Sequence, residues 1–148
     1  MIIDSTLLFD SAAAITSTAT STNVIDLSDY RDIGIGYPMK LLIVGDGLFA
    51  AAGAATLTIS VQGSVDNSAW TTYLSSLALS IAQMNASGFV LGIDWPRPPS
   101  AAISTPQYLR LNYTVATGPF TAGSLTAGLV LDRGDMLYYP SGYTTTYV

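Results

Sequence analysis

The sequence predicts an all-β sandwich or barrel. Apolar residues recur at every second position in several short segments, which places them on one face of a strand. Gly, Pro, Asn and Asp residues that favour turns separate these segments. Helical periodicity is weak throughout the chain. About eight short strands with turns between them are typical of a sandwich or a barrel.

The clearest strand covers residues 57–65, where Leu, Ile and Val alternate with Thr, Ser and Gln. The side chains of Asp66 and Asn67 can hydrogen-bond the neighbouring backbone, so a turn is expected there. Residues 70–74 then return as a second strand. Further strands are expected at residues 23–27, 39–44, 77–81 and 89–95. The glycines of residues 45–56 predict a loop, with a short helical turn of its alanines as the alternative.

The most regular stretch is YLRLNYTVATGPFTAGSLTAGLVLD, which occupies residues 108–132. Leu, Tyr and Val alternate with Arg, Asn and Thr in residues 108–115, and the alternation resumes in residues 124–132. The residues between them contain Gly and Pro and are too many for a two-residue hairpin turn. We therefore expect two antiparallel strands joined by a loop, with their apolar faces in the core.

The composition argues against an enzyme. The chain of 148 residues contains no Cys, His or Glu, and its acidic residues are ten aspartates. Catalysis near neutral pH most often uses histidine as the base. A reaction carried by paired aspartates would need two carboxylates that face each other across a cleft, and no spacing indicates such a pair. We predict no catalytic site, no metal site and no cofactor.

Charged side chains are scarce, at 10% of the residues against about 25% in ordinary soluble domains. Because a free domain normally keeps a charged surface, we expect partners to cover much of this one; a weakly charged monomer is the alternative. The net charge of −5 argues against nucleic acid. The sequence contains no run of 18 apolar residues, so no membrane span is expected. The N-terminus lacks the cations of a signal peptide, so we expect synthesis in the cytoplasm.

The two ends of the chain differ from its middle. Residues 1–22 are expected to form an arm or first strand, residues 23–133 the sandwich, and residues 134–148 a tyrosine-rich arm. Tyrosine suits a surface where the ring is buried and the hydroxyl meets a polar rim. An edge strand of the same domain is the open alternative for the tail. The candidate residues for contact with a partner are Ile2, Ile3, Leu7, Leu8, Phe9, Tyr138, Tyr139, Tyr143 and Tyr147.

Three stretches in order resemble a known family: ITSTATSTNVIDLSDYRDIGIGYP (15–38), LTISVQGSVDNSAW (57–70) and the stretch 108–132 quoted above. With them the chain resembles the jelly-roll cement, or decoration, proteins on the capsids of short-tailed bacteriophages. The resemblance implies an eight-stranded jelly roll on the outer capsid surface of the virion. It also implies binding to the major capsid protein, and homo-oligomers with dimers favoured over trimers.

The chief rival function is a carbohydrate-binding or host-attachment module of the virion, because the same fold class supports both functions. Trp70, Tyr73 and Trp95 could form a platform on which sugar rings stack, although aromatic residues on strands are more often part of the core.

Overall fold

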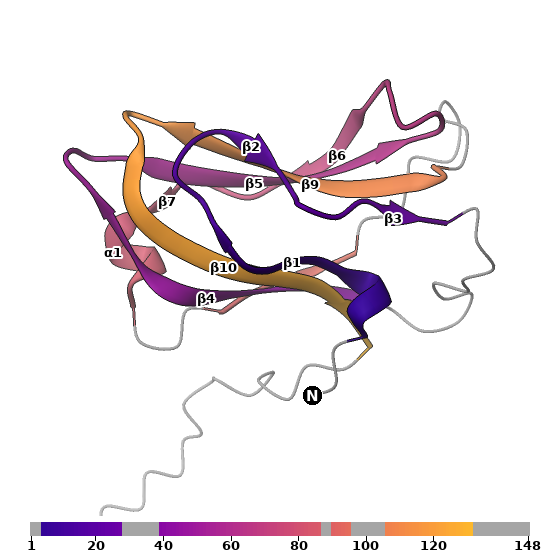
Figure 1. Cartoon of the computed structure of the whole chain (residues 1–148), viewed down its shortest axis with the longest axis horizontal. Helices are drawn as coiled ribbons and strands as arrows, with labels where there is room; N and C mark the ends of the chain where they lie inside the picture. Colours follow the sequence, from indigo (N-terminus) through magenta and orange to yellow (C-terminus); the bar gives the residue numbers. More distant parts are fainter. Residues whose placement is uncertain (1–3, 28–38, 87–89, 96–105, 132–148) are drawn as a thin grey trace, which may run out of the picture.

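Two antiparallel sheets face each other across one apolar core (Figure 1). The structure is a computed structural model that describes residues 4–27, 39–86, 90–95 and 106–131. Sheet A has the strand order β1 (Leu8–Ala14), β10 (Phe120–Val130), β4 (Lys40–Ala51) and β8 (Val90–Asp94). Sheet B has the order β2 (Ala19–Thr20), β9 (Tyr108–Ala116), β5 (Thr56–Ser64) and β6 (Thr71–Ser75), while β3 (Ile25–Asp26) also pairs with β9 and β7 (Leu79–Ser80) with β5.

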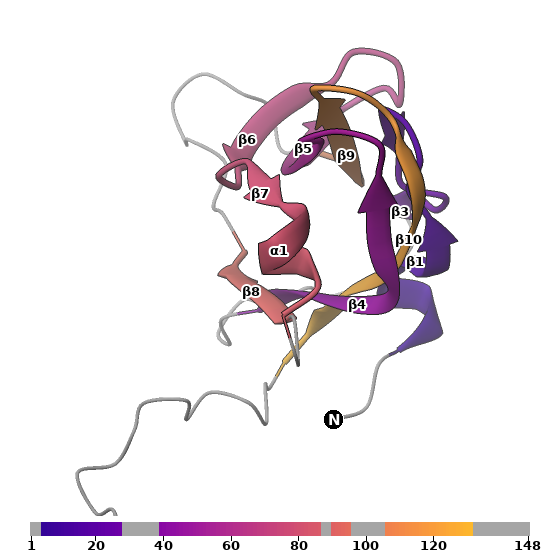
Figure 2. The same cartoon turned by 90° about the vertical axis from the view of Figure 1, so that its left-hand side faces the viewer.

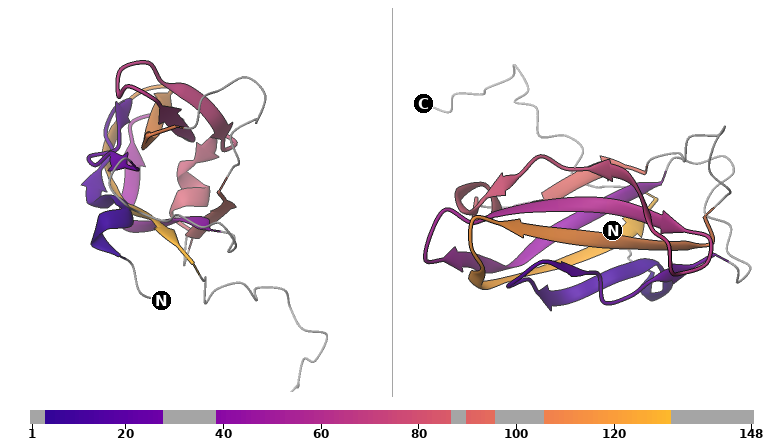
Figure 3. Two further views of the ribbon diagram at one scale, coloured as in Figure 1. Left: turned by 90° about the vertical axis from the view of Figure 1, so that its right-hand side faces the viewer. Right: turned by 90° about the horizontal axis from the view of Figure 1, so that it is seen from above.

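The strand order is that of a jelly roll. The chain passes from β1 in sheet A to β2 and β3 in sheet B, and it alternates between the sheets at nearly every later connection. If β2 and β3 count as one interrupted strand, and β6 and β7 as another, the sandwich has two sheets of four strands. The end-on views show the sheets above and below the core, with β1 and β3 on one side and helix α1 on the other (Figures 2 and 3). The predicted jelly-roll-like β-sandwich is confirmed.

The expected pairing between the strands of residues 108–132 is wrong. Strand β9 pairs with β5 in sheet B, whereas β10 pairs with β1 and β4 in sheet A. The loop between them contains Thr117 and Gly118, both with positive φ (64° and 111°), so the backbone turns sharply from one sheet to the other. The alternation therefore predicted each strand correctly and could not indicate that their apolar faces meet across the core.

Two local expectations also need correction. Residues 45–51 belong to β4 rather than to a loop, and Gly45 and Gly47 lie where the register with β10 shifts, because glycine suits the local distortion of a bulge. Residues 77–81 were expected as a strand, but only Leu79–Ser80 pair with β5. Ser80 then caps the short helix α1 (Ile81–Met84) in a capping box with Gln83.

The core explains one of the family-like motifs, FTAG at residues 120–123. The rings of Phe49 and Phe120 meet edge to face, with their centroids 5.4 Å apart, and both are buried. Gly123 has φ +145°, and a Cβ atom at this position would overlap the Phe49 ring. Asn85, at the end of α1, accepts a hydrogen bond from the Phe49 N–H and donates one to its carbonyl, each 2.8 Å long. These contacts hold Phe49 in place over Gly123.

A buried hydrogen bond joins the two sheets. Tyr113 of β9 in sheet B donates its hydroxyl to the Asp10 carboxyl of β1 in sheet A at 2.5 Å, and both side chains are at most 1% exposed. The second carboxyl oxygen of Asp10 accepts the backbone N–H of Thr22 at 2.8 Å. The side chain and backbone of Ser21 bond to the backbone of Leu111 in sheet B, and the Asn23 N–H donates to the Phe9 carbonyl in sheet A. Residues 21–23 thus close this side of the sandwich.

Replacing Tyr113 with Phe is expected to lower the free energy of unfolding by about 1–3 kcal/mol at neutral pH, because it leaves a buried carboxyl group without one of its partners. Urea denaturation measures the change. Tyr108→Phe on the same strand is the control, because its hydroxyl makes no hydrogen bond to a described residue, and a change within about 0.5 kcal/mol is expected. Equal effects of the two variants would contradict a stabilising role for the Asp10–Tyr113 bond.

The stability of Tyr113→Phe should also depend less on alkaline pH than the stability of wild type does. Burial, together with the hydrogen bond to Asp10 and its charge, raises the pKa of Tyr113 far above its usual value. The unfolded chain loses this phenol proton above about pH 10 while the folded protein keeps it, so the wild-type stability falls as the pH rises through that range. Tyr113→Phe lacks this contribution, so its denaturation midpoint should fall less between about pH 9 and 11. A parallel decline in both proteins would contradict the prediction.

Gly123→Ala is expected to lower the free energy of unfolding by about 2–4 kcal/mol, because the new methyl group overlaps a buried ring and the backbone angle suits only glycine. Thermal or urea denaturation measures the loss. Gly53→Ala is the matched control, since the nearest atom to its Cβ would be 3.8 Å away. The control should change stability by less than about 1 kcal/mol; a comparable loss at both positions would show that the Phe49 contact is not the cause.

Candidate binding surface

The outer side of sheet B is a surface of uncharged polar side chains. Along β5 the side chains of Leu57, Ile59 and Val61 point into the core, so the alternate residues face outward. We call this surface the polar face and define it by Thr58, Ser60 and Gln62 of β5, Thr72 and Ser75 of β6, Arg110, Asn112 and Thr114 of β9, and Trp70, which precedes β6. Strands β5, β6 and β9 contribute one charged side chain to it, Arg110. Edge strand β3 places Asp26 beside Tyr108.

Side-chain hydrogen bonds run across the polar face from strand to strand. The register aligns Arg110 of β9 with Gln62 of β5 and Gln62 with Thr72 of β6. Arg110 donates its Nε–H to the Gln62 side-chain carbonyl at 2.8 Å, and the Gln62 amide donates to the Thr72 hydroxyl at 3.1 Å. In the next row the Ser60 and Ser75 hydroxyls lie 2.9 Å apart. The side chains of this face are therefore ordered relative to one another.

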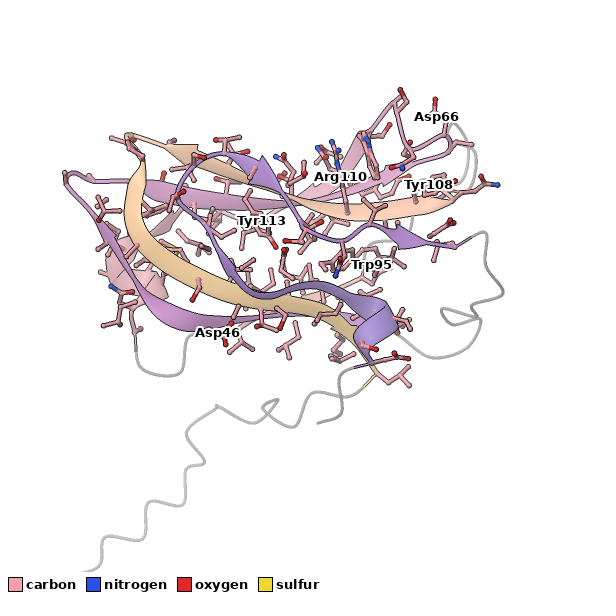
Figure 4. All side chains as sticks on the ribbon, viewed as in Figure 1. Asp46, Asp66, Trp95, Tyr108, Arg110 and Tyr113 are labelled. Atoms are coloured by element: carbon pink, nitrogen blue, oxygen red, sulfur yellow. The ribbon has the colours of Figure 1, made fainter. Side chains whose placement is uncertain are left out.

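Arg110 is fixed in two directions. Gln62 holds it along the sheet, and its guanidinium carbon lies 4.0 Å from the centre of the Trp70 ring, a cation–π contact. Partial burial lowers the pKa of the guanidinium from its usual value, yet an arginine stays protonated in proteins. Figure 4 shows the side chain of Arg110 on the side of sheet B that faces away from sheet A. The face thus presents one positive charge in a defined orientation.

The three aromatic residues that could have formed a sugar platform do not come together, and two of them pack against the core as the alternative had it. Trp95 follows β8 and stacks on the buried Phe9 ring at 6.0 Å between centroids. Tyr73 packs against the apolar core, with its ring directly over Gly63. Only Trp70 lies on the polar face, and Arg110 covers one side of its ring. The platform of Trp70, Tyr73 and Trp95 is therefore wrong.

Of the predicted N-terminal contact residues, the structure describes Leu7, Leu8 and Phe9, and only Phe9 is fully buried. Phe9 is 0% exposed and belongs to the core, so the prediction that it contacts a partner is wrong: its ring fills space between the sheets. Leu8 is the first residue of β1 and is half-buried, and Leu7 is half-buried at the end of a short 3₁₀ helix (Ser5–Leu7) that packs beside β10. The segment predicted as an arm or first strand is thus a strand from Leu8 onward.

The remaining candidates, Ile2, Ile3, Tyr138, Tyr139, Tyr143 and Tyr147, lie outside the described residues. Among the residues that are described, no three potential metal ligands cluster, and no helix is long and apolar enough to cross a membrane. Lys40 forms a salt bridge with Asp94 at 3.5 Å, which joins β4 to the edge strand β8 in sheet A.

Sequence reasoning did not single out Arg110 or Gln62 as a pair. The alternation in residues 57–65 and 108–115 indicated that both point away from the core. The missing information was the register that aligns them, because 48 residues separate Gln62 from Arg110 in the chain. The sequence offered one signal for this pair: Arg110 is the single charged residue among the outward-facing polar residues of these two segments.

Comparison with known proteins assigns the chain to a family. The Bbp16 family model matches residues 9–129, a range that begins in β1 and ends one residue before the end of β10. The match therefore includes both sheets and the whole polar face. No curated protein matches the chain. Because the matched range covers most of the 148 residues, the chain belongs to the Bbp16 family.

Proposed function

We propose that the protein is a structural component of a bacteriophage virion that binds the outside of the assembled capsid and cements neighbouring major capsid subunits. The observation that carries the proposal is the polar face, which is broad, ordered and nearly free of charge. Surfaces that stay in water normally carry many charged residues of both signs. The centres of protein interfaces are instead depleted of Lys, Asp and Glu, as this face is, and Arg and Trp, of which the face has one each, are residue types favoured there.

The family-like stretches support the proposal in a second way. The described parts of these stretches include residues 21–23, which bond to both sheets, most of strand β5, and the strands β9 and β10. Their most regular side chains build a rigid sandwich and contain no nucleophile next to a histidine base, since the chain has no histidine. A rigid domain without reactive groups suits a mechanical role.

The mechanism would be additional interface area. Packaged DNA pushes the capsid subunits apart, and a protein bound across their junction must be detached before the shell can open there. Because the protein would bind the assembled shell and not separated subunits, it would stabilise assembly by mass action. The main partner would be the major capsid protein, with a second copy of this chain as a further partner, and the protein would reside on the outer capsid surface.

Copy number tests this function. A cement protein is expected in hundreds of copies per particle, as quantified from band intensities on a gel of purified virions, because the capsid offers many equivalent junctions. A few copies per virion would indicate a tail or fibre component and would contradict the proposal. Shells stripped of the protein should also lose resistance to heat and regain it when purified protein is added back.

Deletion of residues 134–148 tests the tyrosine-rich arm separately. We expect lower occupancy on purified particles and an unchanged melting temperature of the domain, since β10, the last strand among the described residues, ends at Val130. Four tyrosines in a short segment offer large contact area at low entropic cost. Full occupancy of the shortened protein would show that the arm does not contribute to capsid binding, and the proposed cement function would stand.

A further inference from the structure

Arg110 uses only one of its hydrogen-bond donor groups, the Nε–H, in bonds to described residues. Its Nε–H bonds to Gln62, and no other described residue accepts a hydrogen bond from its guanidinium group. Among the described residues no carboxylate lies within ion-pair distance of it, whereas Lys40 is paired with Asp94. Its two terminal nitrogens are the groups that form the parallel pair of bonds to a carboxylate. On the outer side of sheet B, Arg110 is therefore a positive charge that no carboxylate of the described residues neutralises.

The contacts of Arg110 reduce the entropic cost of using this charge. An arginine side chain on a surface loses rotamer freedom when it binds, which weakens the complex. Here Gln62 and Trp70 already restrict the side chain from two sides. Gln62 is in turn held by Thr72, so three adjacent strands contribute to the orientation. Arginines with this kind of support are typical energetic centres of protein interfaces.

The chemistry of the face indicates its ligand. The surrounding hydroxyl and amide groups on β5, β6 and β9 carry no charge. A ligand that matches this face would therefore place one acidic group opposite the Arg110 guanidinium and neutral polar groups around it. The polar face extends over three paired strands, as an interface with a protein does, whereas small-ligand sites are concave pockets. Arg110 covers one side of the Trp70 ring, so a sugar could stack on the other side at most.

We propose that Arg110 is the central anchor of the partner contact and that it binds an aspartate or glutamate carboxylate of the capsid protein through its two terminal nitrogens. Gln62 and Trp70 act as positioning residues. The inference rests on the proposed function, because it names the contact through which that function would work. In this contact, sheet B of the jelly roll would be turned toward the shell.

The test uses full-length protein and capsid shells from which this protein has been removed. Arg110→Gln should bind the shells about 10- to 100-fold more weakly than wild type, since a charge-assisted contact is lost. Lys40→Gln is the matched control, because it makes the same change in net charge on sheet A; it should bind within about twofold of wild type, since strand β4 is not part of the polar face. The melting temperature of each variant shows whether it is folded.

Two further variants separate charge from geometry. Arg110→Lys keeps the charge but lacks the planar pair of donors, so it should recover only part of the affinity. Gln62→Met keeps the charge and the side-chain length but removes the acceptor that orients Arg110, so it should weaken binding less than Arg110→Gln does. Raising the salt concentration should weaken the binding of wild type more than that of Arg110→Gln, because salt screens the charge pair.

The outcomes distinguish the two proposals. If wild type does not bind the shells, the cement function fails and the anchor fails with it. If wild type binds and folded Arg110→Gln binds equally well, the anchor is wrong while the cement function stands. If Arg110→Gln does not fold, equal shell affinities of wild type and Arg110→Lys would overturn the anchor. Binding to an array of acidic glycans that Arg110→Gln abolishes would assign the site to a sugar acid and would also overturn it.

Discussion

The hydrogen bond between Asp10 and Tyr113 is the constraint on which the sandwich depends, because it crosses from sheet A to sheet B inside the core. A buried carboxyl group is costly unless its oxygens are bonded, and here one oxygen accepts the phenol and the other the backbone of Thr22. Both requirements are met only if β1, β9 and the segment after β1 take their observed positions. Apolar packing alone tolerates sliding of one sheet over the other, whereas this polar pair permits one arrangement.

Much of the fold could be predicted from local pattern. The alternation of residues in β5 and β9 indicated strands whose bounds the structure reproduces to within one or two residues. The pattern could not show that β9 and β10 lie in different sheets, because alternation specifies which side is apolar and not which strand pairs with it. The glycines of β4 predict a loop as readily as a strand, because a bulged strand and a loop both favour glycine.

The candidate site was less accessible to sequence reasoning, for a physical reason. Phe9 was predicted to contact a partner together with the apolar residues before it, whereas the structure buries its ring in the protein's own core. Arg110 drew no attention because its importance comes from neighbours distant in the chain, Gln62 and Trp70. Burial follows from hydrophobicity and can be read locally, whereas the preorganisation of a polar group depends on register.

The placement of the two ends of the sandwich has a further consequence. Strand β1 begins at Leu8 opposite Gly128, and β10 ends two residues later at Val130, so the chain enters and leaves sheet A at neighbouring points. The polar face belongs to the other sheet. The contacts proposed above, at the chain ends and on the face of sheet B, would then be two separate sites of attachment. Once either is engaged, the other would bind at the high effective concentration of a tethered group, so two individually weak contacts could give slow release.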